Sequence, residues 1–353
     1  MNRLHHIDTV KAIAAQCIVW HHFSAYGPLS DALFETYPTL ASWFYEYGRM
    51  AVQVFLVMGG YFAARSLTPD GVWRYTQNRS LWNTVGGRWL RLVLPFAVAL
   101  LFTVLCSLWA DRWLDGTDDD FISPLPHIGQ IVAHLSLSFD ILDIDALSAG
   151  AWYVAMDFQL YGFFALLMWV AGRWGWMLVG GMMLASLFVF NRYAEWDIWT
   201  VYFFGSYGMG ALVWWAQKAA TPARVRACLW LLVGSGALAL VWDFRPRVAL
   251  AWLFSLWLLA VDTQRIPPMP FTLPDGLRRV MQHGVQHLGQ SSYALFLTHF
   301  AVLMLANALW AHQPWQMENP LPLLLAAWCV CMGLAFAFER WVERKLSFLS
   351  IAK

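Results

Sequence analysis

Three ionisable residues lie on one stripe of the first apolar segment of the chain. Lys11 and His22 are eleven positions apart, which in an α-helix is within about 20° of three full turns and about 16 Å along the axis. Asp8, three residues before Lys11, lies on the same face. Ionisable side chains inside a membrane helix are costly and mark functional sites by default. We therefore interpret this stripe as functional, whereas His21, which points about 100° away from it, is the weaker candidate.

A carboxylate on a second segment is predicted to lie at the depth of His22. Asp157 comes five residues after Trp152, so it lies about 8 Å along the helix that opens there. A carboxylate beside an imidazole fixes its tautomer and raises its basicity, which is what a general base needs. The alternative is a buried polar bridge that fixes helix packing, and spacing alone favours neither function.

Two arginines, Arg88 and Arg91, are predicted to lie together at the inner end of the third apolar segment. At a spacing of three residues both guanidinium groups lie on one face of a helix, where they could bind phosphates. The alternative is that they extend to the membrane surface and set the topology. The spacing alone favours this alternative.

The ninth apolar segment places His299 near the middle of the membrane. A hydrogen-bonded core histidine is the slightly favoured interpretation, and a catalytic role is the other. His283 and His287 have metal-ligand spacing but no acidic partner nearby, so we predict no metal site. At the inner end of the last segment, Glu339 is predicted to form a local ion pair with Arg340.

The composition is that of a membrane protein. Hydrophobic residues make up 59% of the 353 residues and charged residues 13%, whereas soluble proteins carry about 25% charged residues. The long apolar stretches predict an all-α, polytopic membrane protein, and the net charge of +1 gives no indication of nucleic-acid binding. Within the second stretch, Gly59 and Gly60 are predicted to allow close helix packing. The expected spans are 9–26, 48–66, 89–110, 151–171, 174–190, 198–216, 226–242, 247–262, 290–311 and 321–341.

The charges of the connecting segments predict the orientation. Residues 65–91 carry five Arg against one Asp, whereas residues 111–145 carry eight Asp against one Arg. Basic connections alternate with acidic or neutral ones, so the positive-inside rule places both termini in the cytoplasm. The turn at 243–247, with two Arg and one Asp, is an exception on the outer side. We see no internal repeat and expect a single domain over residues 1–353.

These motifs, taken in order, resemble membrane acyltransferase family 3, which contains O-acyltransferases of polysaccharides, lipopolysaccharides and peptidoglycan. Lys11 stands where the family has Arg, and Asp157 stands where it has Glu. The similarity covers almost the whole chain, and the extracytoplasmic hydrolase-like domain fused to some members is not expected here. The first matching motif is Asp8-Thr9-Val10-Lys11, followed after ten residues by His22. The others are the segment of residues 55–61, the pair Arg88 and Arg91, the set Trp152, Asp157, Gln159 and Tyr161, the segment Ser292–His299, and Phe338-Glu339.

The resemblance implies an enzyme of the bacterial cytoplasmic membrane with acyl-coenzyme A, most simply acetyl-coenzyme A, as donor substrate and no bound cofactor. The acceptor would be a hydroxyl of a cell-surface glycan or glycolipid. His22 would be the general base, oriented by Asp157. The expected partners are the lipid bilayer and these substrates, and no nucleic acid; the sequence does not indicate the oligomeric state. Donor or substrate contacts would come from Lys11, Arg88, Arg91, Trp152, Tyr153, Gln159, Tyr161 and His299, with Asp8 and Glu339 in structural ion pairs.

Two other functions remain open on sequence grounds. A transporter or flippase for a lipid-linked glycan or another polar solute would use the buried Asp and His as a proton relay. No inverted repeat or pair of broken helices supports it. A scaffold subunit of a glycan synthase would not need the ionisable stripe.

Overall fold

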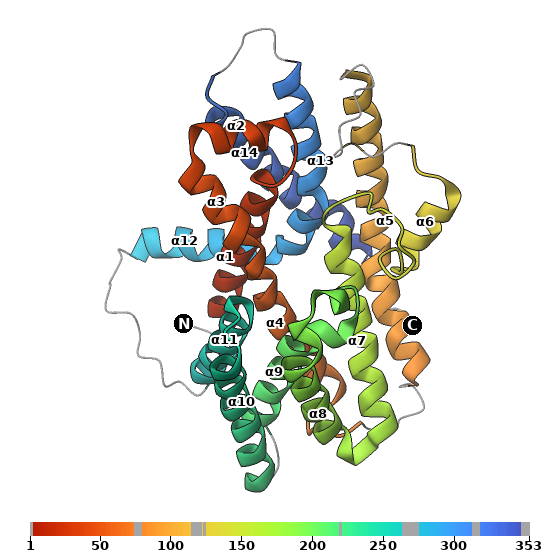
Figure 1. Ribbon diagram of the computed structural model, residues 1–353, viewed down its shortest axis with the longest axis vertical. Helices are drawn as coiled ribbons and strands as arrows, with labels where there is room; N and C mark the ends of the chain where they lie inside the picture. Colours follow the sequence, from red (N-terminus) through yellow and green to blue (C-terminus); the bar gives the residue numbers. More distant parts are fainter. Residues whose placement is uncertain are drawn as a thin grey trace. The chain divides into compact units, whose positions relative to one another are not determined.

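The protein is described by a computed structural model over residues 3–73, 80–113, 122, 125–218, 221–262, 275–312 and 318–346 (Figure 1). Every regular element in these residues is helical, which confirms the predicted all-α class there. Each expected span coincides with one long helix. These are α1 (Arg3–Phe23), α4 (Val52–Leu67), α5 (Leu81–Trp113), α7 (Ala151–Ala171), α8 (Gly175–Phe188), α9 (Thr200–Lys218), α10 (Pro222–Trp242), α11 (Pro246–Asp262), α13 (Ser292–Ala311) and α14 (Leu321–Phe338).

Shorter elements connect the long helices. They are α2 (Pro28–Thr36), α3 (Pro38–Tyr47), α6 (Ile128–Leu135), α12 (Asp275–Gln290), the 3₁₀ turns Gly48–Ala51, Gly172–Trp174, Phe190–Arg192 and Ala194–Trp196, and the π-helix Glu339–Glu343.

Six helical stretches among the described residues are long and apolar enough to cross a membrane, so the chain is a multi-pass membrane protein. Helix α11 is apolar but shorter. Helices α1 and α9 are long enough to cross a membrane but not apolar enough. Helix α1 carries Asp8, Lys11 and four His, and α9 is rich in Gly and Tyr. The number of ten spans and the cytoplasmic position of both termini therefore stay predictions. The six stretches are Pro38–Leu67, Leu81–Trp113, Ala151–Arg192, Pro222–Trp242, Ser292–Ala311 and Leu321–Leu346.

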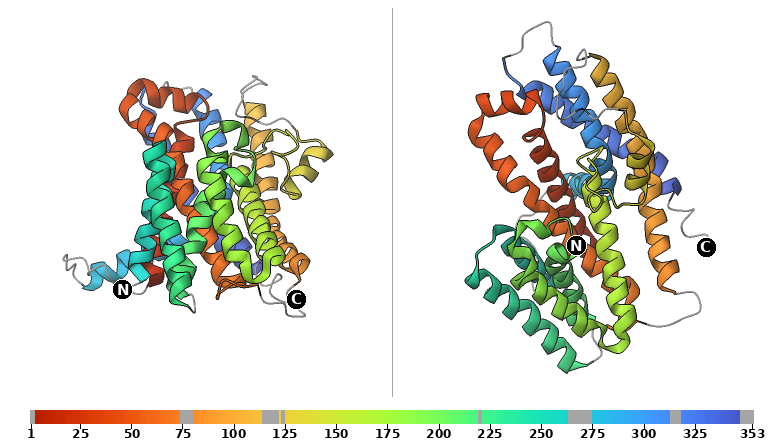
Figure 2. Two further views of the ribbon diagram at one scale, coloured as in Figure 1. Left: turned by 60° about the horizontal axis from the view of Figure 1, so that its bottom comes forward. Right: turned by 45° about the vertical axis from the view of Figure 1, so that its right-hand side comes forward.

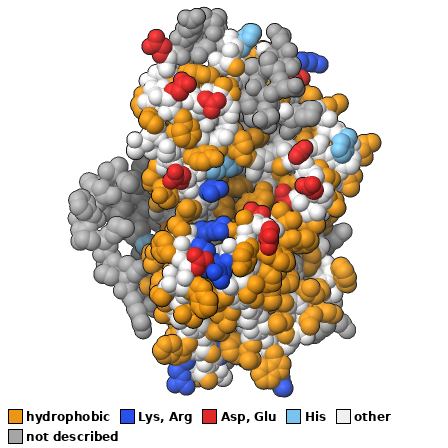
Figure 3. Space-filling view, in the orientation of Figure 1, with side chains coloured by type: hydrophobic (Ala, Val, Ile, Leu, Met, Phe, Trp, Pro, Cys, Tyr) orange, Lys and Arg blue, Asp and Glu red, His pale blue; other side chains and the backbone are white. Residues whose placement is uncertain are grey.

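The described residues form two compact units, each assembled from segments far apart in the sequence. The first unit takes its residues from 52–89 and 156–278, and the second from 4–51, 90–155 and 279–353. Helices α5 and α7 contribute residues to both units. Large hydrophobic side chains are exposed in both, and they cover most of the surface seen in Figure 3. Such a surface suits contact with lipid.

Helix α9 is the centre of the first unit and packs against α4, α8, α10 and α11; Figure 2 shows α8 to α11 running alongside one another. Its contact with α4 depends on glycine. A Cβ atom on Gly60 would lie 1.8 Å from the carbonyl oxygen of Tyr207, and one on Gly210 would lie 1.8 Å from that of Val57. The two helices therefore touch backbone to backbone, which confirms the packing role predicted for Gly60.

We predict that Gly60→Ala lowers stability by about 1–3 kcal/mol, the usual cost of overpacking, because α4 and α9 must move apart to admit one methyl group. The thermal midpoint in detergent measures the effect. Gly181→Ala in α8 and Gly234→Ala in α10 are matched controls, because a Cβ at either position meets no atom within 4 Å. Equal midpoints for Gly60→Ala and these controls would contradict the packing interpretation.

Helix α13 is the centre of the second unit; it is buried along most of its length and packs against α14 and α2. Polar bonds join α1 to α14 and α2 to α13. The Nε1 of Trp328 on α14 donates to Oε1 of Gln16 at 2.7 Å, and the backbone N–H of Leu29 donates to Oδ1 of Asn307 on α13 at 2.8 Å. These contacts fix the register of the first helix, and with it the position of His22.

Candidate active site

His22 and His299 form a buried pair in the second unit. Nδ1 of His22 lies 2.7 Å from Nε2 of His299, and the ring centroids are 4.8 Å apart. The exposed fractions are 8% for His22 and zero for His299. Two helices distant in sequence, α1 and α13, thus bring together two of the residues that the sequence singled out.

The contacts of His299 determine where the protons lie when both rings are neutral. Nδ1 of His299 lies 3.0 Å from the carbonyl oxygen of Leu295, and a carbonyl can only accept, so this nitrogen carries the hydrogen. Nε2 of His299 is then an acceptor and must receive its hydrogen bond from Nδ1 of His22. The remaining nitrogen of His22, Nε2, consequently holds a lone pair. This is the state a general base requires.

Asp157 has a different partner from the one predicted. Its carboxylate forms an ion pair with the Arg88 guanidinium, within the first unit. The Asp157 side chain is 9% exposed and the Arg88 side chain 28%. The structure thus gives Asp157 the partner Arg88 and His22 the partner His299, and the orientation of His22 by Asp157 stays a prediction.

The ion pair does not use all of the hydrogen-bonding capacity of Arg88. The guanidinium carbon lies 5.2 Å from the centroid of the Tyr161 ring, a distance suited to a cation–π contact. Its Nε is buried and has no hydrogen-bond partner among the described residues. Such a buried N–H is costly unless an acceptor reaches it, so Arg88 has a donor available for a ligand.

The other candidates on α7 divide between the two units. Trp152 and Tyr153 belong to the second unit, where the Tyr153 ring lies 5.0 Å from that of Phe296. Gln159 and Tyr161 belong to the first, with Asp157.

A second charged group gathers around Lys11 in the second unit. Lys11 interacts electrostatically with Asp8 and with Glu343, and Glu343 interacts with Arg91. One carboxylate oxygen of Glu343 is buried without a hydrogen-bond partner among the described residues. Sequence reasoning did not single out Glu343, although its position four residues after Glu339 would have been a usable signal.

Glu339 pairs with Arg344 rather than with Arg340. The Arg344 Nε lies 2.5 Å from the Glu339 carboxylate. The reason is local geometry, because residues 339–343 form a π-helix. In this wider turn the backbone bonds join residues five apart, which brings Arg344 beside Glu339. A π-turn inside an α-helix is frequent at functional sites.

His134 is a buried histidine that the sequence analysis did not select. Its Nε2 accepts the N–H of Leu147 at 3.0 Å, and its Nδ1 donates to the carbonyl of Gln130 at 2.8 Å. Only the neutral ring can make both bonds at once, because Nε2 needs its lone pair to accept the N–H of Leu147. Burial lowers the pKa of His134 below its ordinary 6.5, which the bond to Gln130 partly opposes. His134 thus fastens α6 to the segment that leads into α7.

We predict that this fastening weakens in acid. Because the pKa of His134 is lower in the folded than in the unfolded protein, the stability it contributes is complete above pH 6.5 and is lost as the pH falls below that value. Amide-exchange protection of residues 128–150 should decrease between pH 7.5 and pH 5. His134→Gln should remove this pH dependence, whereas His127→Gln, at the exposed helix cap, should retain it. A pH dependence unchanged in His134→Gln would contradict the assignment.

Comparison with known families decides the class of the protein. The acyltransferase domain family matches residues 4–340 of the 353. The chain belongs to membrane acyltransferase family 3. It is a membrane acyltransferase, and the match includes every candidate site residue of the sequence analysis. No curated protein and no solved structure matched the chain.

Proposed function

We propose that this acyltransferase moves an acyl group, most simply acetyl, from cytoplasmic acyl-coenzyme A to a hydroxyl of a cell-surface glycan or glycolipid. The proposal places it in the bacterial cytoplasmic membrane. The observation that carries it is the His22–His299 pair, which leaves the Nε2 lone pair of His22 available for a proton. An acceptor hydroxyl must lose a proton as it attacks, and a buried neutral imidazole can take it.

In the proposed reaction, the acceptor oxygen attacks the thioester carbonyl carbon while Nε2 of His22 takes the hydroxyl proton. The carbon–sulfur bond then breaks, and the coenzyme A thiolate leaves and recovers that proton. The products are an oxygen ester and coenzyme A thiol. As His22 becomes positively charged, its Nδ1–H bond to His299 strengthens, so His299 acts as a positioning residue.

The oxyanion that forms on the carbonyl needs a hydrogen-bond donor. His299 has no free N–H in its neutral form, because Nδ1 is bonded to the Leu295 carbonyl. Tyr153 packs against Phe296, whose ring lies 6.0 Å from that of His299. The Tyr153 hydroxyl is therefore our proposed donor.

Basic groups support phosphate binding by the donor. Lys11 and Arg91 would hold phosphates of coenzyme A in the second unit. In the first unit, the Nε–H of Arg88, which has no partner among the described residues, is a further donor that a phosphate could use. Because Arg88 also stabilises Asp157, Arg91 is the cleaner residue to test. We expect Arg91→Gln to raise the dissociation constant for acyl-coenzyme A about tenfold, because the variant loses one charge-assisted hydrogen bond to a phosphate.

In the direct test, the purified protein is reconstituted in vesicles that contain total lipid and glycan from its host. Acetyl-coenzyme A labelled in the acetyl group is then added. We expect base-labile label on the glycan or glycolipid fraction and a matching release of coenzyme A thiol. Release of the thiol without transfer of label, or no reaction with acetyl-, propionyl- or succinyl-coenzyme A, would contradict the proposal. Movement of unmodified glycolipid across the vesicle membrane would instead favour the transporter or flippase function.

We predict that His299→Leu lowers kcat about 100-fold, within the range of a lost general-base contribution, with little change in KM for the donor. Leucine cannot accept the Nδ1–H of His22, so the base loses its orientation. His299→Gln should recover part of the rate, because the amide oxygen can accept the same bond. Equal rates for the Leu and Gln variants would show that only packing matters at this position.

A further inference from the structure

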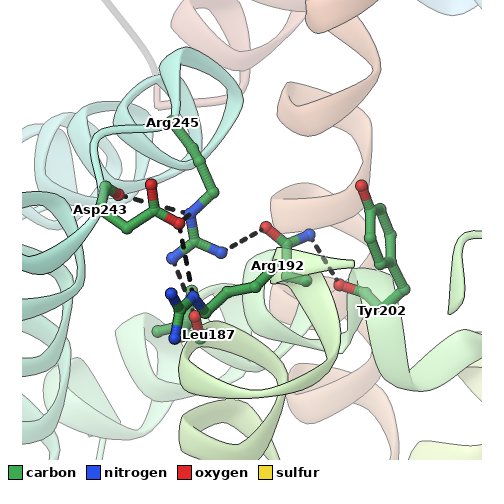
Figure 4. A network of polar contacts seen from close by, with 6 residues as sticks. Leu187, Arg192, Tyr202, Asp243 and Arg245 are labelled. Carbon is green, nitrogen blue, oxygen red and sulfur yellow. Dashed lines mark hydrogen bonds and ion pairs between the residues drawn. The ribbon is translucent and has the colours of Figure 1, made fainter. Parts of the chain in front are cut away.

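Three arginines gather at one end of the first unit, and the proposed reaction does not use them. Arg192 ends the turn after α8, and Arg245 lies where the chain turns from α10 into α11 (Figure 4). Arg247 follows two residues after Arg245, in the first turn of α11. We refer to these residues as the arginine cluster. The opposite end of the unit holds the connections from α9 to α10 and from α7 to α8. On the topology predicted from sequence, the cluster faces outward, where arginine is less common than on the cytoplasmic side.

Arg245 is the buried anchor of the cluster. It donates to Oδ1 of Asn191 at 2.9 Å and to the carbonyl of Leu187 at 2.8 Å. Asn191 in turn donates to the carbonyl of Tyr202 at 3.0 Å. These bonds tie the turn after α8 to the first residues of α9 and hold a positive charge in a fixed position, with 9% of the residue exposed.

The carboxylate beside the cluster does not balance its charge. Asp243 is 3.5 Å from Nε of Arg245 and 3.5 Å from Nε of Arg192, and it is the only ion-pair partner of these arginines among the described residues. Arg247 lies over the Tyr202 ring, 4.8 Å from its centroid. Burial lowers the pKa of Arg245, Asp243 opposes this, and Arg247 and Arg192 lower it further. Two guanidinium groups thus share one carboxylate, and the third is close enough to act electrostatically on Arg245.

The surroundings of the cluster are those of a membrane surface. Aromatic side chains on the same connections are exposed, and aromatic residues of this kind concentrate at the level of the lipid headgroups. Glu195 and Asp197 are exposed on the same segment and form no ion pair with the cluster in the described part of the chain, although Asp197 interacts electrostatically with Tyr202. The exposed aromatic residues are Tyr193, Trp196, Trp199, Trp242 and Phe244.

We propose that the arginine cluster is a binding site for a phosphate group at the membrane surface, with Arg192 and Arg247 contacting the phosphate beside the fixed charge of Arg245. Guanidinium groups match phosphate oxygens in geometry and charge. The phosphate belongs either to a phospholipid headgroup or to a soluble phosphorylated compound. This inference does not depend on the proposed acyl transfer, because it concerns binding alone.

The test uses the full-length protein, delipidated in detergent, and native mass spectrometry with added phosphatidylglycerol. We expect Arg192→Gln with Arg247→Gln to raise the dissociation constant of the tightest phosphatidylglycerol site about tenfold or more. A phosphate-free galactosyl diacylglycerol should bind wild type and variant equally. The matched control is Arg173→Gln with Arg226→Gln, which removes two exposed arginines from the opposite end of the unit.

An unchanged dissociation constant in the cluster variant, or an equal loss in the control variant, would overturn the proposal. If the double variant fails to fold, Arg192→Gln alone carries the test, because its side chain is exposed, and we expect about a threefold weakening. Competition with glycerol 3-phosphate distinguishes a phospholipid headgroup from a soluble phosphorylated compound as the source of the phosphate. Displacement of the lipid supports a soluble phosphate ligand, and retention of the lipid supports a phospholipid ligand.

Discussion

Replacing His22 with alanine is expected to lower the rate of acyl transfer about 1,000-fold, within the range of a general base contribution. The variant should insert and fold as the wild type does, because α1 is also held by the bond between Gln16 and Trp328. The measurement is label transfer from acyl-coenzyme A in vesicles, with the amount of folded protein determined by size-exclusion chromatography.

The control for this experiment is the neighbouring residue. His21 lies on another face of α1, where its Nδ1 is 3.3 Å from the carbonyl oxygen of Phe44. His21→Ala should retain activity within a few-fold of wild type. A His22→Ala variant with normal product yield would remove the catalytic assignment. Similar losses in both variants would point to a general disturbance of the helix instead.

The second large effect concerns the ion pair between Asp157 and Arg88. We expect Asp157→Asn to lower the free energy of unfolding by about 3 kcal/mol, because it leaves a half-buried guanidinium without its counter-charge. Arg88→Gln should cost a similar amount. The double variant should recover much of the loss, since a neutral amide pair replaces the ion pair and no unpaired charge remains. Thermal or denaturant unfolding in detergent provides the four stabilities of this cycle.

Asp243→Asn is a suitable comparison, because Asp243 is 40% exposed and its two arginine contacts are at 3.5 Å. It should cost less than about 1 kcal/mol, as exposed ion pairs usually do. Strictly additive losses for Asp157→Asn and Arg88→Gln would show that the two residues do not stabilise each other. In that case Asp157 would be free for a role in the reaction.

The sequence predicted which residues make close or buried contacts, but not the partner of each residue. The adjacent glycines correctly predicted a close helix contact at Gly60. Helix periodicity selected His22 as a candidate site residue, and its position near the middle of an apolar segment selected His299. Counting residues also gave His22 and Asp157 similar depths, but depth alone does not name the polar partner of either residue. The polar partner of each residue depends on which helices pack together, and the chain order of the segments does not specify this.

The pair at Glu339 shows a different limit. A regular α-helix would not bring Arg344 beside Glu339, because five residues correspond to about 500° of rotation, or 140° beyond one full turn. The π-helix at 339–343 changes that rotation. A single irregular turn is the outcome of packing around it, so periodicity alone did not predict it.

The sequence by itself determined the class of the protein: helical, embedded in a membrane and a member of an acyltransferase family, because hydropathy and ordered motifs are properties of the chain. It also identified the ionisable residues whose burial in a membrane costs free energy. Only the tertiary structure decided the partners, giving Asp157 to Arg88, His22 to His299, and Arg245 to Asn191 and Leu187. The physical reason is that a buried polar group must be satisfied by whichever groups packing brings within reach, and packing joins segments that can be hundreds of residues apart.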